Sequence, residues 1–173
     1  MKRITTPLAK SVRTKLKCGE EVLLTGTIYT ARDAAHKKMA ELVLKKRKLP
    51  FDPKDAIIYY TGPTPKRPDG LFGSCGPTTS NRMDGFTGFL LEKGLGAMIG
   101  KGRRSEEVRR VLKKRDAVYF LTIAGAGAYL AKKIYSSKIM AFRELGPEAI
   151  YKLKVINFPL IVGIDSKGKD IFG

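Results

Sequence analysis

Short apolar runs alternate along this chain with segments of helical periodicity, and no other feature of the sequence restricts the fold as strongly. The runs at 21–29, 56–61, 97–99 and 117–123 are rich in β-branched and aromatic residues, which favour strands. Between them, apolar residues recur at the three- and four-residue spacing of an amphipathic helix. Strands that alternate with helices are typical of a sheet covered by helices. We therefore expect an α/β layered domain.

The two ends of the chain depart from this alternation. Residues 1–20 are basic and lack clear periodicity, which indicates an arm or an early edge strand. The last third is expected to be a β-rich tail, and a chain of 173 residues is most simply one domain, 1–173. The elements expected there are a helix at 128–135, strands at 139–142 and 151–156, and a hairpin over 159–172 that turns at 166–168.

The formal charge is +18, from 34 Lys and Arg against 16 Asp and Glu. A nucleic acid, an acidic protein partner or a small anionic substrate would each account for such a charge. The N-terminal residues carry scattered charges and no apolar core of a signal peptide. The longest uncharged run, 117–131, is too short and glycine-rich to span a membrane. We expect a cytoplasmic protein without membrane attachment.

Cys18 and Cys75 are too few for a disulfide framework and fit a reducing compartment. They are also too few to form a metal site by themselves, so free thiols are the favoured interpretation. His36 is the only histidine. It is expected either to contact the residues of the site without contacting the substrate, or to lie on the surface, and no catalytic role is assigned to it.

The stretch SCGPTTSNRMDGFTGF, at 74–89, is the most informative part of the sequence. It predicts a loop that delivers Thr78 or Thr79 as the N-cap of a helix that continues to about Lys93. Arg82 would then lie one turn into that helix. Unpaired backbone N–H groups, a hydroxyl and a guanidinium would converge there, which suits a carboxylate or a phosphate. The alternative is an ordinary capped helix whose Arg82 is solvated.

Two further cations follow strands in the same way. Arg32 comes directly after the first strand, inside the pattern Thr30-x-x-Asp33, which predicts a capping box. Lys101 lies between two glycines after the strand at 97–99. In open α/β sheets, ligands gather at the carboxyl ends of the strands. Because guanidinium groups pair with carboxylates through two hydrogen bonds, these cations suit a substrate that bears two carboxylates.

Three motifs, in this order, resemble one family: TGTIYTARDAAHKK, GPTTSNRMDGF and GAMIGKG. The chain resembles the β subunit, or C-terminal domain, of the iron–sulfur hydro-lyases, which comprise class I fumarate hydratases and L(+)-tartrate dehydratases. The similarity covers about residues 20–165. It implies a swivelling β/β/α domain that works against an α subunit, or N-terminal domain, carrying a four-iron four-sulfur cluster.

The resemblance also implies roles for four residues. Arg32, Arg82 and Lys101 match positions that hold the substrate carboxylates in the family, and Thr78 matches the proposed base for the C3 proton. An unassisted hydroxyl is a very weak base at neutral pH, so nearby cations or a proton relay would have to assist Thr78. Otherwise Thr78 positions the substrate.

The favoured expectation is therefore the β subunit of a hydro-lyase that hydrates fumarate to malate and is active only in a hetero-oligomer with its α subunit. The partner would hold the iron–sulfur cluster, because this chain lacks a three-cysteine set. A tartrate dehydratase β subunit is the alternative within the family. A basic nucleic-acid-binding module is the alternative outside it, although no RNA- or DNA-binding motif supports that reading. A scaffold that has lost catalysis is disfavoured, because all four residues are present.

Overall fold

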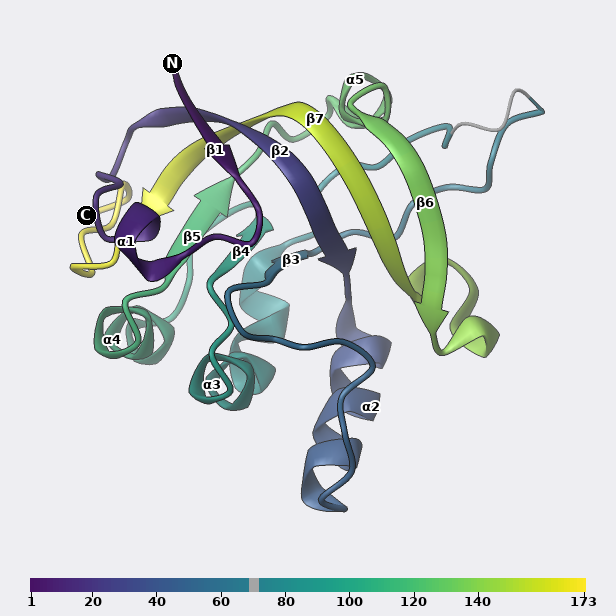
Figure 1. Ribbon diagram of the computed structural model, residues 1–173, viewed down its shortest axis with the longest axis horizontal. Coiled ribbons are helices and arrows are strands. Elements are labelled where there is room, and N and C mark those ends of the chain that lie inside the picture. The colour runs from purple at the N-terminus through teal and green to yellow at the C-terminus, as the bar shows by residue number, and fades with distance from the viewer. Residues whose placement is uncertain (69–71) are drawn as a thin grey trace.

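A seven-stranded mixed sheet forms the centre of the computed structural model, which describes residues 1–68 and 72–173. The strand order is β1-β2-β3-β4-β5-β7-β6, and β7 pairs with both β5 and β2, so the sheet closes on itself (Figure 1). The strands are β1 (Lys2–Thr5), β2 (Glu21–Thr30), β3 (Ile57–Tyr59), β4 (Ala97–Gly100), β5 (Val118–Leu121), β6 (Ile134–Ala141) and β7 (Ile150–Ile164).

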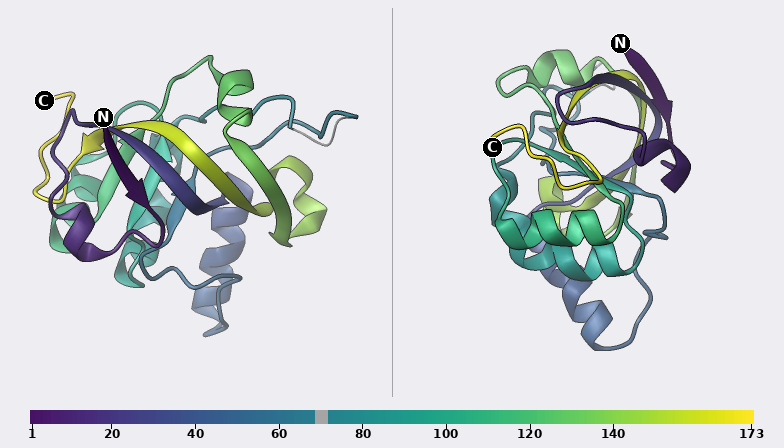
Figure 2. Two further views of the ribbon diagram at one scale, coloured as in Figure 1. Left: turned by 45° about the horizontal axis from the view of Figure 1, so that its top comes forward. Right: turned by 90° about the vertical axis from the view of Figure 1, so that its left-hand side faces the viewer.

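Helices cover the sheet unevenly. The α-helices are α1 (Lys10–Arg13), α2 (Asp33–Leu44), α3 (Asp84–Glu92), α4 (Glu106–Lys114) and α5 (Gly127–Ala131), and two 3₁₀ segments are η1 (Ser80–Met83) and η2 (Arg143–Glu148). Figure 2 shows the strands curving into a ring, with α2, α3 and α4 on one side of it and α5 on the other. This arrangement is the layered α/β fold that the sequence predicts.

Two apolar clusters account for the continuous hydrophobic runs of the central strands. Successive side chains of a strand point to opposite faces, so β3 places Ile57 and Tyr59 in one cluster and Ile58 in the other. The first cluster is enclosed by the curved sheet, and the second is shared with helix residues such as Met39 and Leu91. Strands buried on both faces are expected to be apolar throughout.

Strands β2, β3, β4 and β5 are parallel neighbours. Their carboxyl ends therefore lie along one edge of the sheet, which is where ligands bind in open α/β folds. The loops that follow these ends begin with Ala31, Tyr60, Lys101 and Thr122. The fold thus brings together three of the chain regions in which the sequence places its candidate site residues.

Several local predictions are confirmed. The four predicted strands between residues 21 and 123 are present, and β1 pairs in parallel with β2, so the basic start contains an edge strand. Ser105, followed by Glu106 and Glu107, is also typical of a helix start. It is the N-cap of α4, and its Oγ accepts a hydrogen bond from the Val108 N–H at 3.2 Å. The helix of the central stretch ends close to the predicted position, at Glu92, and Gly94 follows with a φ of +94°.

The predicted capping box at Thr30 is wrong. Thr30 is still part of β2, and Arg32 occupies the N-cap position of α2. The Thr30 hydroxyl contacts the neighbouring strand instead: it donates to the Ala149 carbonyl at 3.3 Å and accepts from the Tyr151 N–H at 3.0 Å. The local sequence pattern would assign the Thr30 hydroxyl to the helix. In the structure this hydroxyl is used where β2 pairs with β7 instead.

The C-terminal predictions are partly wrong. The helix predicted at 128–135 ends at Ala131, because residues from Ile134 onward form β6, which pairs antiparallel with β7. The hairpin predicted over 159–172 is also wrong in extent, since β7 continues to Ile164. A turn follows there, and a single antiparallel bridge joins Ile164 to Asp170.

Across residues 1–68 and 72–173, no helix combines the length and the apolar character needed to cross a bilayer.

Candidate active site

The segment from Thr78 to Ser80 lies across the carboxyl ends of β3 and β4. The Thr78 N–H donates to the Tyr60 carbonyl at 2.8 Å, immediately after β3. Thr79 forms a parallel bridge with Lys101, immediately after β4, and the Ser80 N–H donates to the Lys101 carbonyl at 3.0 Å. Two of the predicted site residues, Thr78 and Lys101, therefore sit on neighbouring backbone segments at one sheet edge.

Gly100 makes this close approach feasible. A Cβ atom at Gly100 would lie 1.8 Å from Ser80 Oγ, which is too close for any side chain, and 3.0 Å from the Tyr60 ring. Ser80 Oγ instead accepts the Lys101 N–H at 3.1 Å. The glycine before Lys101 thus serves to dock the central stretch against the end of β4.

The threonine hydroxyls do not cap a helix, which corrects the sequence-based prediction. Thr79 is the residue before η1, but its side chain makes no capping hydrogen bond, and the α-helical part starts only at Asp84. The segment between them is a single 3₁₀ turn that contains Arg82. The half-buried Thr78 lies before this turn, so its hydroxyl is not committed to the helix.

Arg32 and Arg82 flank the same carboxylate. Arg82 Nε donates to Asp33 Oδ1 at 3.1 Å, and Arg82 Nη2 lies 3.1 Å from Asp33 Oδ2. Arg32 Nε lies 4.0 Å from the same Oδ2 atom. The structure therefore brings two of the predicted cations together. Asp33 was not recognised as a site residue from the sequence, where its place in the first helical turn suggested only a capping function.

The Arg32 guanidinium is more enclosed than that of Arg82, although Arg82 makes the shorter contacts with Asp33. Arg32 Nε lies 3.9 Å from Glu148 Oε1, and a Cβ at Gly62 would lie 3.1 Å from Arg32 Nη1. The absence of a side chain at Gly62 therefore lets the loop after β3 pass close to Arg32 without a tight contact. The Arg32 side chain is 27% exposed and that of Arg82 is 51% exposed, so Arg82 is the more accessible to a ligand.

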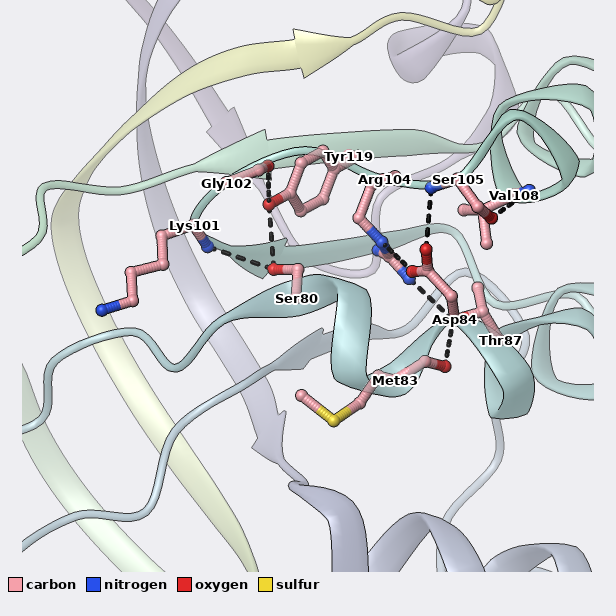
Figure 3. Close-up of polar contacts among 10 residues, drawn as sticks. All are labelled: Ser80, Met83, Asp84, Thr87, Lys101, Gly102, Arg104, Ser105, Val108 and Tyr119. Carbon is pink, nitrogen blue, oxygen red and sulfur yellow. Dashed lines mark hydrogen bonds and ion pairs between the residues drawn. The ribbon is translucent and has the colours of Figure 1, made fainter.

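Lys101 carries the third cation. Figure 3 shows its side chain pointing away from the polar contacts around Ser80 and Tyr119. In the part of the chain that the structure describes, no carboxylate oxygen lies within 4.0 Å of Lys101 Nζ. Its charge is therefore not offset by a direct ion pair with any of those residues.

Comparison with known proteins identifies the family. A family model described as the fumarase C-terminus matches residues 3–173. The chain belongs to the fumarase C-terminus family. The resemblance inferred from the three sequence motifs is thereby confirmed.

Relatives of this fumarase C-terminal chain differ in length. It is 40% identical over 171 residues to the putative L(+)-tartrate dehydratase subunit beta of Methanocaldococcus jannaschii, covering 95% of this chain and 88% of that protein. It is 44% identical over 153 residues to the anaerobic class I fumarate hydratase of Escherichia coli, covering 86% and 28%. It is 41% identical over 164 residues to the mitochondrial fumarate hydratase 1 of Leishmania major, covering 93% and 29%. The chain thus spans less than a third of these two fumarate hydratases.

His36 supports the start of α2 from inside the fumarase C-terminal fold. It is fully buried, so the surface interpretation is wrong. The Arg32 carbonyl accepts the His36 N–H at 2.9 Å and lies 2.7 Å from Nδ1. A carbonyl can only accept, so Nδ1 carries the ring proton. Burial lowers the pKa of His36 to about 4, although the bond to the Arg32 carbonyl acts in the opposite direction.

This buried histidine predicts a pH-dependent stability. Between pH 6.5 and 4 the unfolded chain binds a proton at His36 that the folded chain excludes, so stability falls as the pH falls through that window. We expect the unfolding free energy of wild type, minus that of His36→Gln, to decrease by about 2–3 kcal/mol between pH 7 and pH 4.5. Urea unfolding of both proteins at the two pH values measures this difference. A difference that does not change with pH would contradict the buried neutral imidazole.

The cysteines of the chain do not fit the iron–sulfur cluster of the implied enzyme. Such clusters are held by several cysteine thiolates, but Cys18 and Cys75 are the only two in the sequence. Cys75 is buried against Thr61, and burial raises its pKa to about 12, which keeps it a neutral thiol. Among the described residues, no three His, Cys, Asp or Glu side chains are grouped so that they could hold a metal ion.

Proposed function

We propose that this chain is the β subunit, or C-terminal part, of an iron–sulfur hydro-lyase that reversibly hydrates fumarate to malate. The observation that carries the proposal is the pair Arg32 and Arg82 around one carboxylate, at the sheet edge that also presents Lys101 and Thr78. The names of the relatives, fumarate hydratase and tartrate dehydratase subunit beta, support the same class of reaction.

The three cations have two functions in this proposal. Each guanidinium can bind a substrate carboxylate through paired hydrogen bonds, and the Lys101 ammonium adds a point charge. Asp33 keeps the Arg82 guanidinium oriented before the substrate arrives. When a proton leaves the carbon beside a carboxylate, negative charge builds on that carboxylate. Fixed positive donors stabilise this charge in the transition state.

Thr78 is the proposed proton-transfer residue. Its backbone is fixed by the hydrogen bond to the Tyr60 carbonyl, and its hydroxyl is not used for helix capping. The neighbouring cations favour the deprotonated form of a hydroxyl, which partly compensates for its weak basicity. A substrate held by Arg82 and Lys101 would lie beside this hydroxyl.

The cluster is proposed to belong to a partner α subunit, because the cysteines of this chain do not fit it. The cluster would supply the Lewis-acid chemistry that removes or adds the hydroxyl group. In this proposal the chain acts in a hetero-oligomer in the cytoplasm and is inactive by itself. Its own residues bind the diacid, orient it and handle the proton.

Fumarate and tartrate stay as alternatives within the family. Malate and tartrate differ by one hydroxyl group, and the residue that senses this group can lie on the partner. One relative, of which this chain covers 88%, is named a putative tartrate dehydratase subunit. The two fumarate hydratases described above match this chain over 28–29% of their own length, at similar identity.

Co-expression with the cluster-bearing subunit under anaerobic conditions tests the proposal. We expect the purified complex to interconvert fumarate and malate, while the isolated chain shows no turnover. Conversion of tartrate but not of malate would support the alternative substrate. Turnover by the isolated chain, or a cluster-loaded complex that converts none of the three diacids, would contradict the proposal.

The nucleic-acid alternative rests on the charge of +18. A salt titration of RNA binding distinguishes it from the hydro-lyase. Tight binding at physiological salt, with an affinity that falls steeply as salt increases, would favour the nucleic-acid module. We expect weak binding instead.

A further inference from the structure

A buried polar cluster lies directly behind the Thr78–Arg82 segment (Figure 3). Its centre is Arg104, whose side chain is fully buried. Arg104 Nε donates to Asp84 Oδ1 at 2.6 Å, and its Nη2 donates to Thr87 Oγ1 at 2.7 Å. Both acceptors belong to the first turn of α3, so a residue of the loop after β4 is bonded to the helix that follows Arg82.

The same loop is attached to α3 at a second point. Asp84 Oδ2 accepts the backbone N–H of Ser105 at 2.7 Å. The Arg104 guanidinium also lies between two aromatic rings, 5.2 Å from the centroid of Tyr60 and 5.0 Å from that of Tyr119. The ion pair, the hydroxyl acceptor and the two aromatic faces offset part of the cost of removing this cation from water, while its Nη1 atom has no hydrogen-bond partner among the described residues.

The Tyr119 hydroxyl connects this cluster to Lys101. It lies 2.9 Å from Ser80 Oγ and 2.9 Å from the Gly102 carbonyl, and Ser80 Oγ accepts the Lys101 N–H. A hydroxyl has one proton, and a carbonyl can only accept. The Tyr119 proton therefore goes to Gly102, and Ser80 donates to the Tyr119 oxygen. The hydrogen bonds run in one direction, from the Lys101 N–H through Ser80 and Tyr119 to Gly102.

This chain of bonds holds the backbone on both sides of the Lys101 side chain. Ser80, which lies inside this chain of bonds, is two residues from both Thr78 and Arg82. Burial raises the pKa of Tyr119 well above its ordinary value, so the phenol keeps its proton at neutral pH. Because Tyr119 lies on β5, a rigid strand fixes the spacing between two separate parts of the site.

We propose that Tyr119 is a positioning residue that fixes the position of the Lys101 ammonium relative to Thr78 and Arg82. Arg104 holds the same loop against α3 from the other side. The inference rests on the proposed function, because Lys101 needs to be placed only if it binds the substrate. The Tyr119 hydroxyl itself does not face the substrate. Misplacing a substrate-binding group by about 1 Å can lower a rate about 100-fold.

Tyr119→Phe tests this inference, because it removes only the hydroxyl and keeps the ring that packs on Arg104. In the complex with the cluster-bearing subunit, we expect kcat/KM for the diacid to fall about 10–100-fold, with part of the loss in KM. Amide exchange at Lys101 should become faster in the same variant. Tyr29→Phe is the control, since the Tyr29 ring stacks on Phe51 and its hydroxyl is not part of the chain of bonds. It should leave the kinetics unchanged.

A double-mutant cycle separates positioning from general destabilisation. Ser80→Ala breaks the same bond chain at the neighbouring hydroxyl, so Tyr119→Phe combined with Ser80→Ala should lose about as much kcat/KM as either single variant. Additive losses would overturn the inference, as would wild-type kcat and KM for Tyr119→Phe. If the wild-type complex converts no diacid, the proposed function fails. Unchanged exchange at Lys101 in Tyr119→Phe would then overturn the bond chain independently.

Discussion

Replacing Arg82 with alanine in the assembled enzyme is expected to lower turnover about 10²–10³-fold. The guanidinium is half exposed at the sheet edge and is oriented by Asp33, so its loss removes a fixed positive donor without emptying the core. The transition state carries more negative charge on the substrate carboxylate than the ground state does. The missing donor should therefore reduce kcat as well as raise KM.

Steady-state kinetics with malate and fumarate measures the effect of Arg82→Ala. Arg47→Ala is a matched control, because Arg47 is exposed beyond the far end of α2. The free energy of unfolding should change by no more than about 1 kcal/mol in Arg82→Ala, as is usual for exposed ion pairs. Near-wild-type kinetics in this variant would remove Arg82 from the site.

Thr78→Val is expected to lower kcat about 10²–10⁴-fold, the range that a single proton-transfer residue contributes. Valine keeps the β-branched shape, and the hydrogen bond from the residue 78 N–H to the Tyr60 carbonyl does not depend on the side chain. The variant should also lose exchange of the C3 proton of malate with deuterated solvent. Nuclear magnetic resonance of malate incubated with the complex measures this exchange.

Thr78→Ser is the control for this prediction, because it restores a hydroxyl at the same position. It should recover most of the exchange if the hydroxyl handles the proton. An increase in KM with an unchanged rate of C3 exchange in Thr78→Val would limit Thr78 to positioning the substrate. Wild-type kcat in Thr78→Val would exclude both functions.

The elements that hold the site could be predicted because their signals are local. A short apolar run rich in β-branched and aromatic residues, such as that of β3, favours a strand buried on both faces, and the order of strands and helices implies a shared carboxyl edge. That reasoning located Arg32, Arg82 and Lys101 near strand ends. It failed at Thr30, whose hydroxyl bonds to residues about 120 positions away in the sequence.

The supporting residues could not be predicted, because their partners are distant in sequence. Ser80 and Tyr119 are separated by 39 positions, and nothing in either neighbourhood indicates that the two hydroxyls meet. The sequence does not distinguish Arg104 from the other basic residues of this positively charged chain, although the Arg104 side chain is fully buried. Asp33 pairs with Arg82 across 49 positions. Contacts of this kind depend on the packed structure rather than on local pattern.

The central claim is that one small diacid contacts Arg32, Arg82, Lys101 and Thr78 together. A crystal structure of the two-subunit complex with a bound dicarboxylate is the most direct test. We expect both guanidinium groups and the Lys101 ammonium within hydrogen-bond distance of the carboxylates, with the Thr78 hydroxyl facing C3. A diacid held elsewhere, with these four groups out of its reach, would contradict the claim.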